Sequence, residues 1–201
     1  MTDPEIAVQA HVPGPIYRLV LHPQVADYAP ASWAEIIQSL QATAFLGEAY
    51  PVDKKKRYYI GDKFLQMITF MGCSPHIEIE PRESGALDFC HIVFSDIPSK
   101  VLFRHHERDV YARCPECGRR DSNWPEFIDA WSEQPAKDYL CPNCESRMSP
   151  YAIGWRNSAG FARLFIDILS VHPHEAVPTE QLLLLLKKIT GQDWVYFYCH
   201  A

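Results

Sequence analysis

Two cysteine pairs constrain this chain more than any other feature. Cys114 and Cys117 enclose a Pro-Glu dipeptide, and Cys141 and Cys144 enclose Pro-Asn. Each Cys-Pro-x-Cys turn offers two thiolates from one tight loop, so the two turns together supply the four ligands of a tetrahedral metal site. Four protein ligands leave no position for water or substrate, which makes such a metal structural rather than catalytic. We therefore predict one structural metal ion held by these four cysteines.

The segment around the turns resembles the zinc-ribbon family, the zinc-finger class with rubredoxin-type knuckles. Residues 114–118 read Cys-Pro-Glu-Cys-Gly, which matches the knuckle of that family, whereas the second turn carries Glu145 where the family has glycine. The resemblance covers about residues 110–150 and implies a single structural Zn²⁺ as the cofactor. Iron suits the same all-sulfur ligands. The competing interpretations are two redox Cys-x-x-Cys motifs or four ordinary buried cysteines.

Composition favours a folded protein of a reducing compartment. Of the 201 residues, 47% are hydrophobic, which is enough to bury a core, and the formal charge of −6 disfavours general attraction to nucleic acid or anionic membranes. The cysteine count of seven is odd, unlike that of a secreted disulfide scaffold. Residues 1–5 lack the features of a signal peptide, and the longest aliphatic run, residues 182–186, cannot span a membrane. We expect a cytoplasmic protein without a membrane segment.

Apolar periodicity predicts the elements around the turns. Helices are predicted from Ser32, from Asp62 to Gly72, and over residues 124–131, 161–169 and 179–190. Asn157 or Ser158 is expected to cap the helix at 161–169. Thr179 is expected to cap the last helix, and Gly191 to end it. Strands are predicted over residues 16–21, 75–81, 88–94, 101–104, 110–113 and 194–198. This irregular order predicts an α+β fold, with a small antiparallel sheet, packed helices and an inserted four-cysteine zinc ribbon.

We expect three segments along the chain. Residues 1–109 form an N-terminal α+β part with a proline-rich arm, two helices and a hairpin, and residues 110–150 form the zinc-ribbon insertion. Residues 151–201 supply helices and a closing strand that pack on the N-terminal part. The ribbon is an insertion rather than an appendage because further predicted elements follow it.

Charge helps to choose among the roles that zinc ribbons play, which are nucleic-acid binding, protein docking and stabilisation. Residues 113–147 carry five basic and seven acidic side chains, the opposite of the balance expected for a phosphate-binding module. Trp124 and Trp131 would suit a protein contact if exposed, or the interior of their own domain if buried. We therefore predict a non-catalytic, zinc-stabilised factor that binds another protein, as an adaptor, assembly factor or regulatory partner. The leucines at 182–186 and the strand at 194–198 could form part of that interface or fill the core.

Two further functions stay open. In the first, the basic run Lys54–Arg57 and the ribbon together bind nucleic acid, which requires these residues to lie on one face with Arg119 and Arg120. A solvated basic loop is the simpler interpretation of that run.

The second is an enzyme centred on Cys73 and His76, which lie three residues apart in a predicted loop and could form a nucleophile pair or half of a metal site. Either Cys90 or His91 could complete that cluster, but not both, because adjacent strand residues point to opposite faces. A capped helix end with a buried cysteine is the simpler interpretation here.

Overall fold

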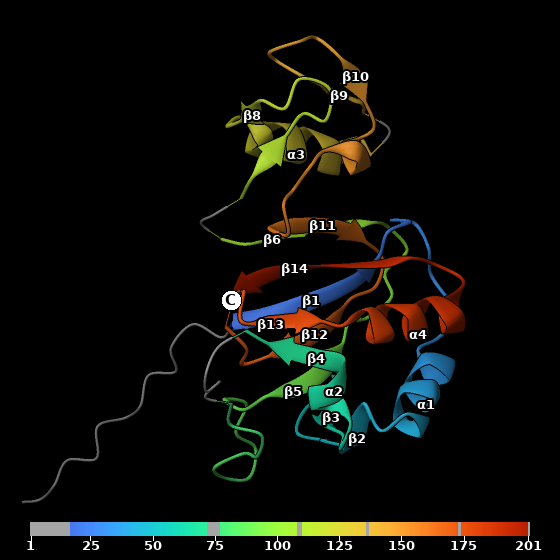
Figure 1. Cartoon of the computed structure of the whole chain (residues 1–201). Helices are drawn as coiled ribbons and strands as arrows, with labels where there is room; N and C mark the ends of the chain where they lie inside the picture. Colours follow the sequence, from blue (N-terminus) through green and yellow to red (C-terminus); the bar gives the residue numbers. More distant parts are fainter. Residues whose placement is uncertain (1–16, 72–76, 108–109, 136, 173, 201) are drawn as a thin grey trace, which may run out of the picture.

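The computed structural model describes residues 17–71, 77–107, 110–135, 137–172 and 174–200 (Figure 1). For His200 it describes the backbone alone. The fold is α+β, as predicted. The described helices are α1 (Ala34–Ala42), α2 (Phe64–Met67), α3 (Trp124–Glu133), α4 (Glu180–Thr190) and the short 3-10 turn η1 (Pro150–Ala152).

A six-stranded antiparallel sheet forms the centre of the molecule. Its strand order is β14 (Trp194–His200), β1 (Tyr17–Pro23), β12 (Ile166–Leu169), β5 (His91–Phe94), β3 (Lys56–Ile60) and β2 (Leu46–Ala49). The remaining strands form two-stranded pairs, namely β4 (Ile68–Phe70) with β13 (Ala176–Pro178), β6 (Leu102–His105) with β11 (Ala159–Ala162), β7 (Ala112–Arg113) with β8 (Arg120–Asp121), and β9 (Tyr139–Leu140) with β10 (Arg147–Met148).

The two faces of the central sheet pack against different layers. Alternate residues of β1 show the division, because Leu19 and Leu21 join the core beneath α1, α2 and α4, whereas Val20 joins a smaller cluster with Ala162 of β11 and Phe197. A third cluster lies beyond β6 and β11, in the part of the chain that carries the cysteines. Figure 1 shows this part above the β6–β11 pair and the helices α1 and α2 on the other side. We refer to residues 110–155 as the cysteine unit.

Helix α4 forms where its capping residues predict it. The Thr179 side chain accepts a hydrogen bond from the backbone N–H of Leu182, and Gly191 ends the helix in the left-handed conformation at φ 70°. Leu182 and Leu186 are fully buried, so they fill the core. Leu184 is 56% exposed.

The helix predicted from Asp62 to Gly72 is wrong over its second half. Helix α2 ends at Met67, and the chain continues directly into β4, which pairs with β13. The predicted strand at 75–81 is not a strand at residues 77–81, although Cys90 donates a backbone hydrogen bond to the carbonyl of Glu78. Residues 75 and 76 lie outside the described part.

The helix predicted over residues 161–169 is also wrong, because this segment forms β11 and β12. Every residue of both strands is buried, so apolar side chains are needed on both faces, and their spacing imitates a helical stripe. Asn157 and Ser158 belong to a tight turn before β11 instead of a helix cap. Apart from hairpins, the order of strands in a sheet depends on tertiary contacts, so local periodicity does not predict it.

Two buried histidines make the fold sensitive to acid. His22 donates from Nδ1 to the carbonyl of Pro23 at 2.9 Å, and burial lowers its pKa to about 4, with the Pro23 hydrogen bond opposing the shift and the charge of Arg104 adding to it. The pKa of His91 is also lowered, chiefly by burial.

We expect the free energy of unfolding to fall as the pH decreases from about 6.5 to about 4. In this window the unfolded chain protonates at His22, whose ordinary pKa is 6.5, while the folded protein stays neutral there, so protons favour unfolding. The loss from His22 alone is on the order of 3 kcal/mol. Urea unfolding over a pH series measures it, and His22→Asn should flatten the slope. Equal slopes in both proteins would contradict the assignment.

Candidate metal centre

Two short hairpins position the four cysteines. In the first, between β7 and β8, the Cys114 N–H donates to the Arg119 carbonyl at 3.1 Å and the Gly118 N–H donates to the Cys114 carbonyl at 2.9 Å. The second hairpin, between β9 and β10, repeats this pattern at equivalent positions, with Cys141 bonded to Ser146 and Glu145 bonded to Cys141, each at 3.0 Å. The two turns therefore share one backbone geometry, as their matching sequences predict.

The four sulfur atoms gather at one point. All of them lie within 4.8 Å of one another. The Sγ atoms of Cys114 and Cys144 are 3.7 Å apart, and those of Cys117 and Cys141 are 3.8 Å apart. A tetrahedral site with zinc–sulfur bonds of about 2.3 Å has sulfur–sulfur edges of about 3.8 Å, whereas a disulfide requires about 2.05 Å. The spacing therefore fits four thiolates around one metal ion and excludes disulfides between these pairs.

The environment of the sulfur atoms shifts the pKa of two of the four thiols, in opposite directions. Hydrogen bonds from the Ser146 hydroxyl and backbone lower the pKa of Cys144 to about 6. The Asn143 N–H points at the sulfur of Cys141 at 3.4 Å. A backbone hydrogen bond from Arg119 favours the thiolate of Cys117, but desolvation and the neighbouring sulfur atoms outweigh it and raise its pKa to about 11. Four thiolates close together repel one another, so deprotonation of all four is unfavourable without a metal. A bound cation offsets this repulsion.

Glu145 takes the same left-handed conformation as Gly118, the residue at the equivalent position of the first turn. Its φ of 58° places it in the left-handed region, as Gly118 is at φ 69° in the first turn. The departure from the knuckle pattern therefore leaves the geometry intact. The conformation destabilises the turn, because a non-glycine residue in the left-handed region is about 1–2 kcal/mol less favourable than in the right-handed region.

We expect Glu145→Gly to stabilise the cysteine unit by about 0.5–1 kcal/mol, since relief of left-handed strain exceeds the entropy cost of glycine. The matched control Gly118→Ala should have the opposite effect, by about 1 kcal/mol. Thermal unfolding of the metal-loaded proteins, followed by tryptophan fluorescence, measures both changes. Destabilisation by Glu145→Gly would show that the carboxylate has a stabilising contact of its own.

The cysteine unit is attached through an aromatic cluster. Phe161 of β11 lies with its ring centroid 5.0 Å from Trp131 and 4.7 Å from Phe103 of β6. Trp131 is buried and Trp124 is half-buried, so Trp131 fills the interior of its own unit. Inside the unit, the buried carboxylate of Asp121 accepts from the Tyr139 hydroxyl at 2.8 Å and so links the two hairpins.

The remaining candidate residues do not gather in this way. Cys73 and His76 lie outside the described residues. Cys90 is fully buried, and burial raises its pKa to about 12, which makes it an inert thiol. His91 is also buried, and its Nε2 is 2.8 Å from Nη1 of Arg57 while its Nδ1 donates to the Phe89 carbonyl. His91 is therefore used in a structural contact.

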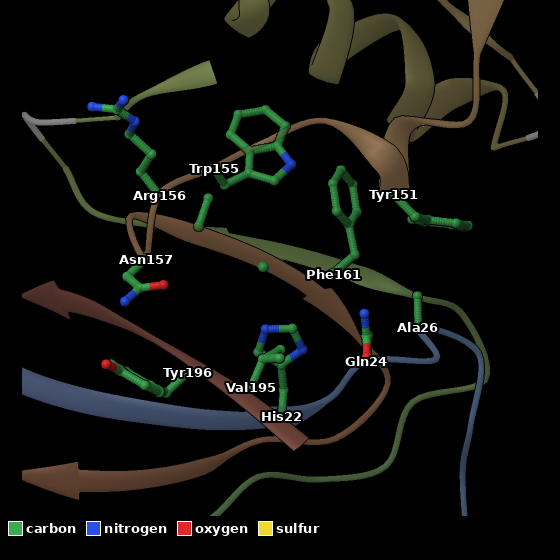
Figure 2. Close-up of a pocket in the computed structure, with 12 residues that line it drawn as sticks. His22, Gln24, Ala26, Tyr151, Trp155, Arg156, Asn157, Phe161, Val195 and Tyr196 are labelled. Atoms are coloured by element: carbon green, nitrogen blue, oxygen red, sulfur yellow. The ribbon is translucent and has the colours of Figure 1, made fainter. Parts of the chain in front are cut away.

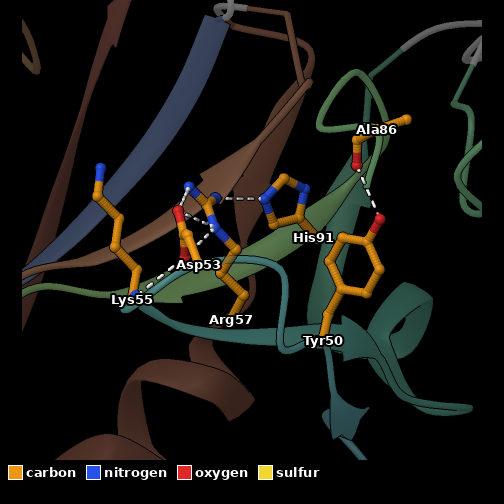
Figure 3. Close-up of polar contacts among 6 residues, drawn as sticks. All are labelled: Tyr50, Asp53, Lys55, Arg57, Ala86 and His91. Carbon is orange, nitrogen blue, oxygen red and sulfur yellow. Dashed lines mark hydrogen bonds and ion pairs between the residues drawn. The ribbon is translucent and has the colours of Figure 1, made fainter. Parts of the chain in front are cut away.

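The basic run is divided between surface and interior (Figure 3). Lys54, Lys55 and Lys56 are exposed, but Arg57 is buried between the carboxylate of Asp53, at 2.9 Å, and His91. Figure 1 places β3 at the opposite end of the molecule from β8, which carries Arg120. Arg120 itself stacks on Tyr111. The common basic face that nucleic-acid binding requires is not formed by these residues.

No protein family, curated protein or solved structure matches the chain. Among the described helices, none is long and apolar enough to cross a lipid bilayer.

Sequence reasoning missed a pocket between the sheet and the cysteine unit (Figure 2). It is lined by residues of β1, β11 and β14, by Gln24 and Ala26 after β1, and by Tyr151 and residues 155–157. The floor of the pocket requires glycine at position 160, because a Cβ atom there would lie only 2.3 Å from Nε2 of His22. From the sequence, Asn157 or Ser158 is instead interpreted as a helix cap, which predicts neither the turn nor the pocket.

Proposed function

We propose that the four cysteines bind a single Zn²⁺ and that this ion stabilises the cysteine unit without taking part in chemistry. The sulfur spacing of 3.7–3.8 Å supports this. Four thiolates complete a tetrahedron, so the ion has no open position. Iron is the rival because it accepts the same ligands. Metal analysis and the visible spectrum separate the two, since zinc sites are colourless and iron–thiolate sites absorb visible light.

Because the ligands must stay reduced, we place the protein in a reducing compartment such as the cytoplasm.

We further propose that the protein acts by binding another protein, as an adaptor, assembly factor or regulatory partner. The observation that carries this proposal is an apolar groove of about 520 Å³ between α3 and β6. Its walls include Leu102, Phe103, Ile128, Trp131 and Tyr151, and Leu102 and Tyr151 are 44% and 45% exposed. Exposed apolar surface beside a metal-stabilised helix is typical of a protein contact.

Affinity purification of the native protein with mass spectrometry tests the proposal. We expect a stoichiometric protein partner that survives nuclease treatment. Leu102→Asp should reduce its recovery, whereas the matched control Leu140→Asp should not, because Leu140 is 53% exposed but lies outside the groove. Recovery of nucleic acid that nuclease removes together with every protein would favour nucleic-acid binding instead.

A further inference from the structure

A second pocket shares Arg156 and Asn157 with the pocket beside His22. Its volume is about 470 Å³, within the range of about 300–1,000 Å³ that small-molecule sites usually span. The lining includes three histidines, three tyrosines, Arg156 and Glu175. These side chains belong neither to the cysteine cluster nor to the apolar groove between α3 and β6. The second pocket is therefore a separate, polar and aromatic site.

Hydrogen bonds fix the frame of this pocket. The Tyr198 N–H donates to the Asn157 carbonyl at 3.0 Å, and the Tyr111 N–H donates to the Ser158 hydroxyl at 3.0 Å. The Tyr198 hydroxyl donates to the Ala176 carbonyl at 2.9 Å. These bonds join β14, β13 and the turn before β11, so the walls are in place before a ligand binds. A preformed site loses less entropy on binding than one that must be ordered.

Two opposite charges line the pocket without neutralising each other. Arg156 and Glu175 are both exposed, and neither forms an ion pair within the described part of the chain. Arg156 takes a left-handed conformation at φ 47°, and its side chain extends away from His22 and Phe161 in Figure 2. Among the described residues of the lining, Arg156 is the only lysine or arginine. One guanidinium matches one phosphate group and is too little charge for a triphosphate.

Aromatic rings form much of the remaining wall. The His174 ring packs on Tyr198 with the ring centroids 4.8 Å apart. Tyr111 is 37% exposed, and the Arg120 guanidinium lies over its ring at 4.5 Å, which leaves the opposite face for a ligand ring. The ring nitrogens of His172 and His174 form no hydrogen bond within the described residues, so each imidazole can donate to a ligand oxygen.

The histidines do not form a second metal site. Among the described residues, only the four cysteines form a group of three or more ligands close enough to share one ion. An organic anion is therefore a better match for this pocket than a metal ion. The volume, the single cation, the carboxylate and the aromatic walls fit a nucleotide, because a nucleotide carries a phosphate, hydroxyl groups and a flat ring.

We propose that this pocket binds a nucleoside monophosphate. The phosphate contacts the Arg156 guanidinium and accepts hydrogen bonds from the imidazoles of the lining. The ribose hydroxyls donate to the Glu175 carboxylate, and the base stacks on the open face of Tyr111. This inference goes beyond the proposed metal-binding and protein-binding functions and uses residues separate from both.

Titration of the full-length, ¹⁵N-labelled protein with the 5′-monophosphates of adenosine, guanosine, cytidine and uridine tests the site by NMR. We expect at least one of them to bind with a Kd below about 1 mM and to shift the amide signals of Asn157 and Glu175. The same nucleoside without its phosphate should bind about tenfold more weakly, because the charge-assisted hydrogen bonds to Arg156 are lost. Inorganic phosphate should also bind more weakly than the monophosphate, because it has no ring to stack.

Variants separate the two halves of the ligand. Arg156→Gln should remove most of the tenfold preference for the monophosphate over the nucleoside. The matched control Arg147→Gln should keep that preference, because Arg147 is exposed on β10 and lies outside the pocket. Tyr111→Ala should weaken binding about tenfold, whereas Tyr111→Phe keeps the ring and should bind as the wild type does.

Three results would overturn the proposal. The first is that none of the four monophosphates binds the wild-type protein. The second is that inorganic phosphate binds as tightly as the best monophosphate, since the pocket would then hold a simple anion. The third is an equal loss of binding in Arg156→Gln and Arg147→Gln, which would show a general effect of charge. The metal content and the recovery of a protein partner are measured separately, so the proposed functions stand or fall independently of this site.

Discussion

Replacing Cys114 with serine is expected to abolish metal binding and unfold the cysteine unit. Structural zinc contributes on the order of 10 kcal/mol of apparent folding free energy, which is comparable to the whole stability of an ordinary domain. Cys114 is 1% exposed, so the loss also leaves a buried hydroxyl without a ligand to bind. Metal content should fall from one ion per chain to nearly none, and the tryptophan emission should shift to the red, because Trp124, Trp131 and Trp155 all lie in this unit.

A matched thiol variant separates metal loss from the general effect of losing a cysteine. Cys90→Ala removes a fully buried thiol of the central core, outside the metal cluster. It should lower global stability by about 1–2 kcal/mol while metal stoichiometry stays at one ion. Hydrogen exchange in Cys114→Ser should rise in the cysteine unit and stay slow in the central sheet. A folded, metal-free Cys114→Ser protein would show that the aromatic cluster alone maintains the unit.

The parts of the structure that the sequence predicts well are those governed by local chemistry. Thr179 and Gly191 bound α4 because capping depends on residues within one turn of the helix end. Likewise, the cysteine turns form their hairpins from five or six consecutive residues. The sequence also predicts that the sulfur atoms of Cys114 and Cys141 lie close together, because two Cys-x-x-Cys turns in one chain commonly bind one metal ion.

The parts that sequence reasoning misses depend on distant contacts. Residues 161–169 have a helical apolar pattern, yet burial on both faces makes them strands. Arg57 looks like part of a solvated basic run, and only the fold places Asp53 and His91 around its guanidinium. The same holds for the pocket beside His22, because the strands β1, β11 and β14 that line it are far apart in sequence. Such sites need the sheet order, which no local pattern contains.

The ion pair between Arg104 and Asp167 is expected to be the most sensitive polar contact of the central layers. Two hydrogen bonds join the side chains, at 2.6 and 3.1 Å, and link β6 to β12. The side chain of Asp167 is only 8% exposed, and the Arg104 guanidinium stacks on the Phe165 ring. Asp167→Ala leaves a largely buried cation without its partner, so it should cost about 3–5 kcal/mol in the free energy of unfolding.

A double substitution tests whether this loss of stability comes from the unpaired charge of Arg104 or from the loss of the ion pair's own interaction energy. Arg104→Met combined with Asp167→Leu removes both charges and keeps apolar volume, so its stability should lie close to wild type or above it. The exposed pair of Lys187 and Asp193 is the control, and Asp193→Ala should cost less than about 1 kcal/mol. Urea unfolding of these variants and of the two single substitutions gives the coupling energy. If the double variant is as unstable as Asp167→Ala, the pair contributes net stability, and the two layers depend on the hydrogen bonds themselves.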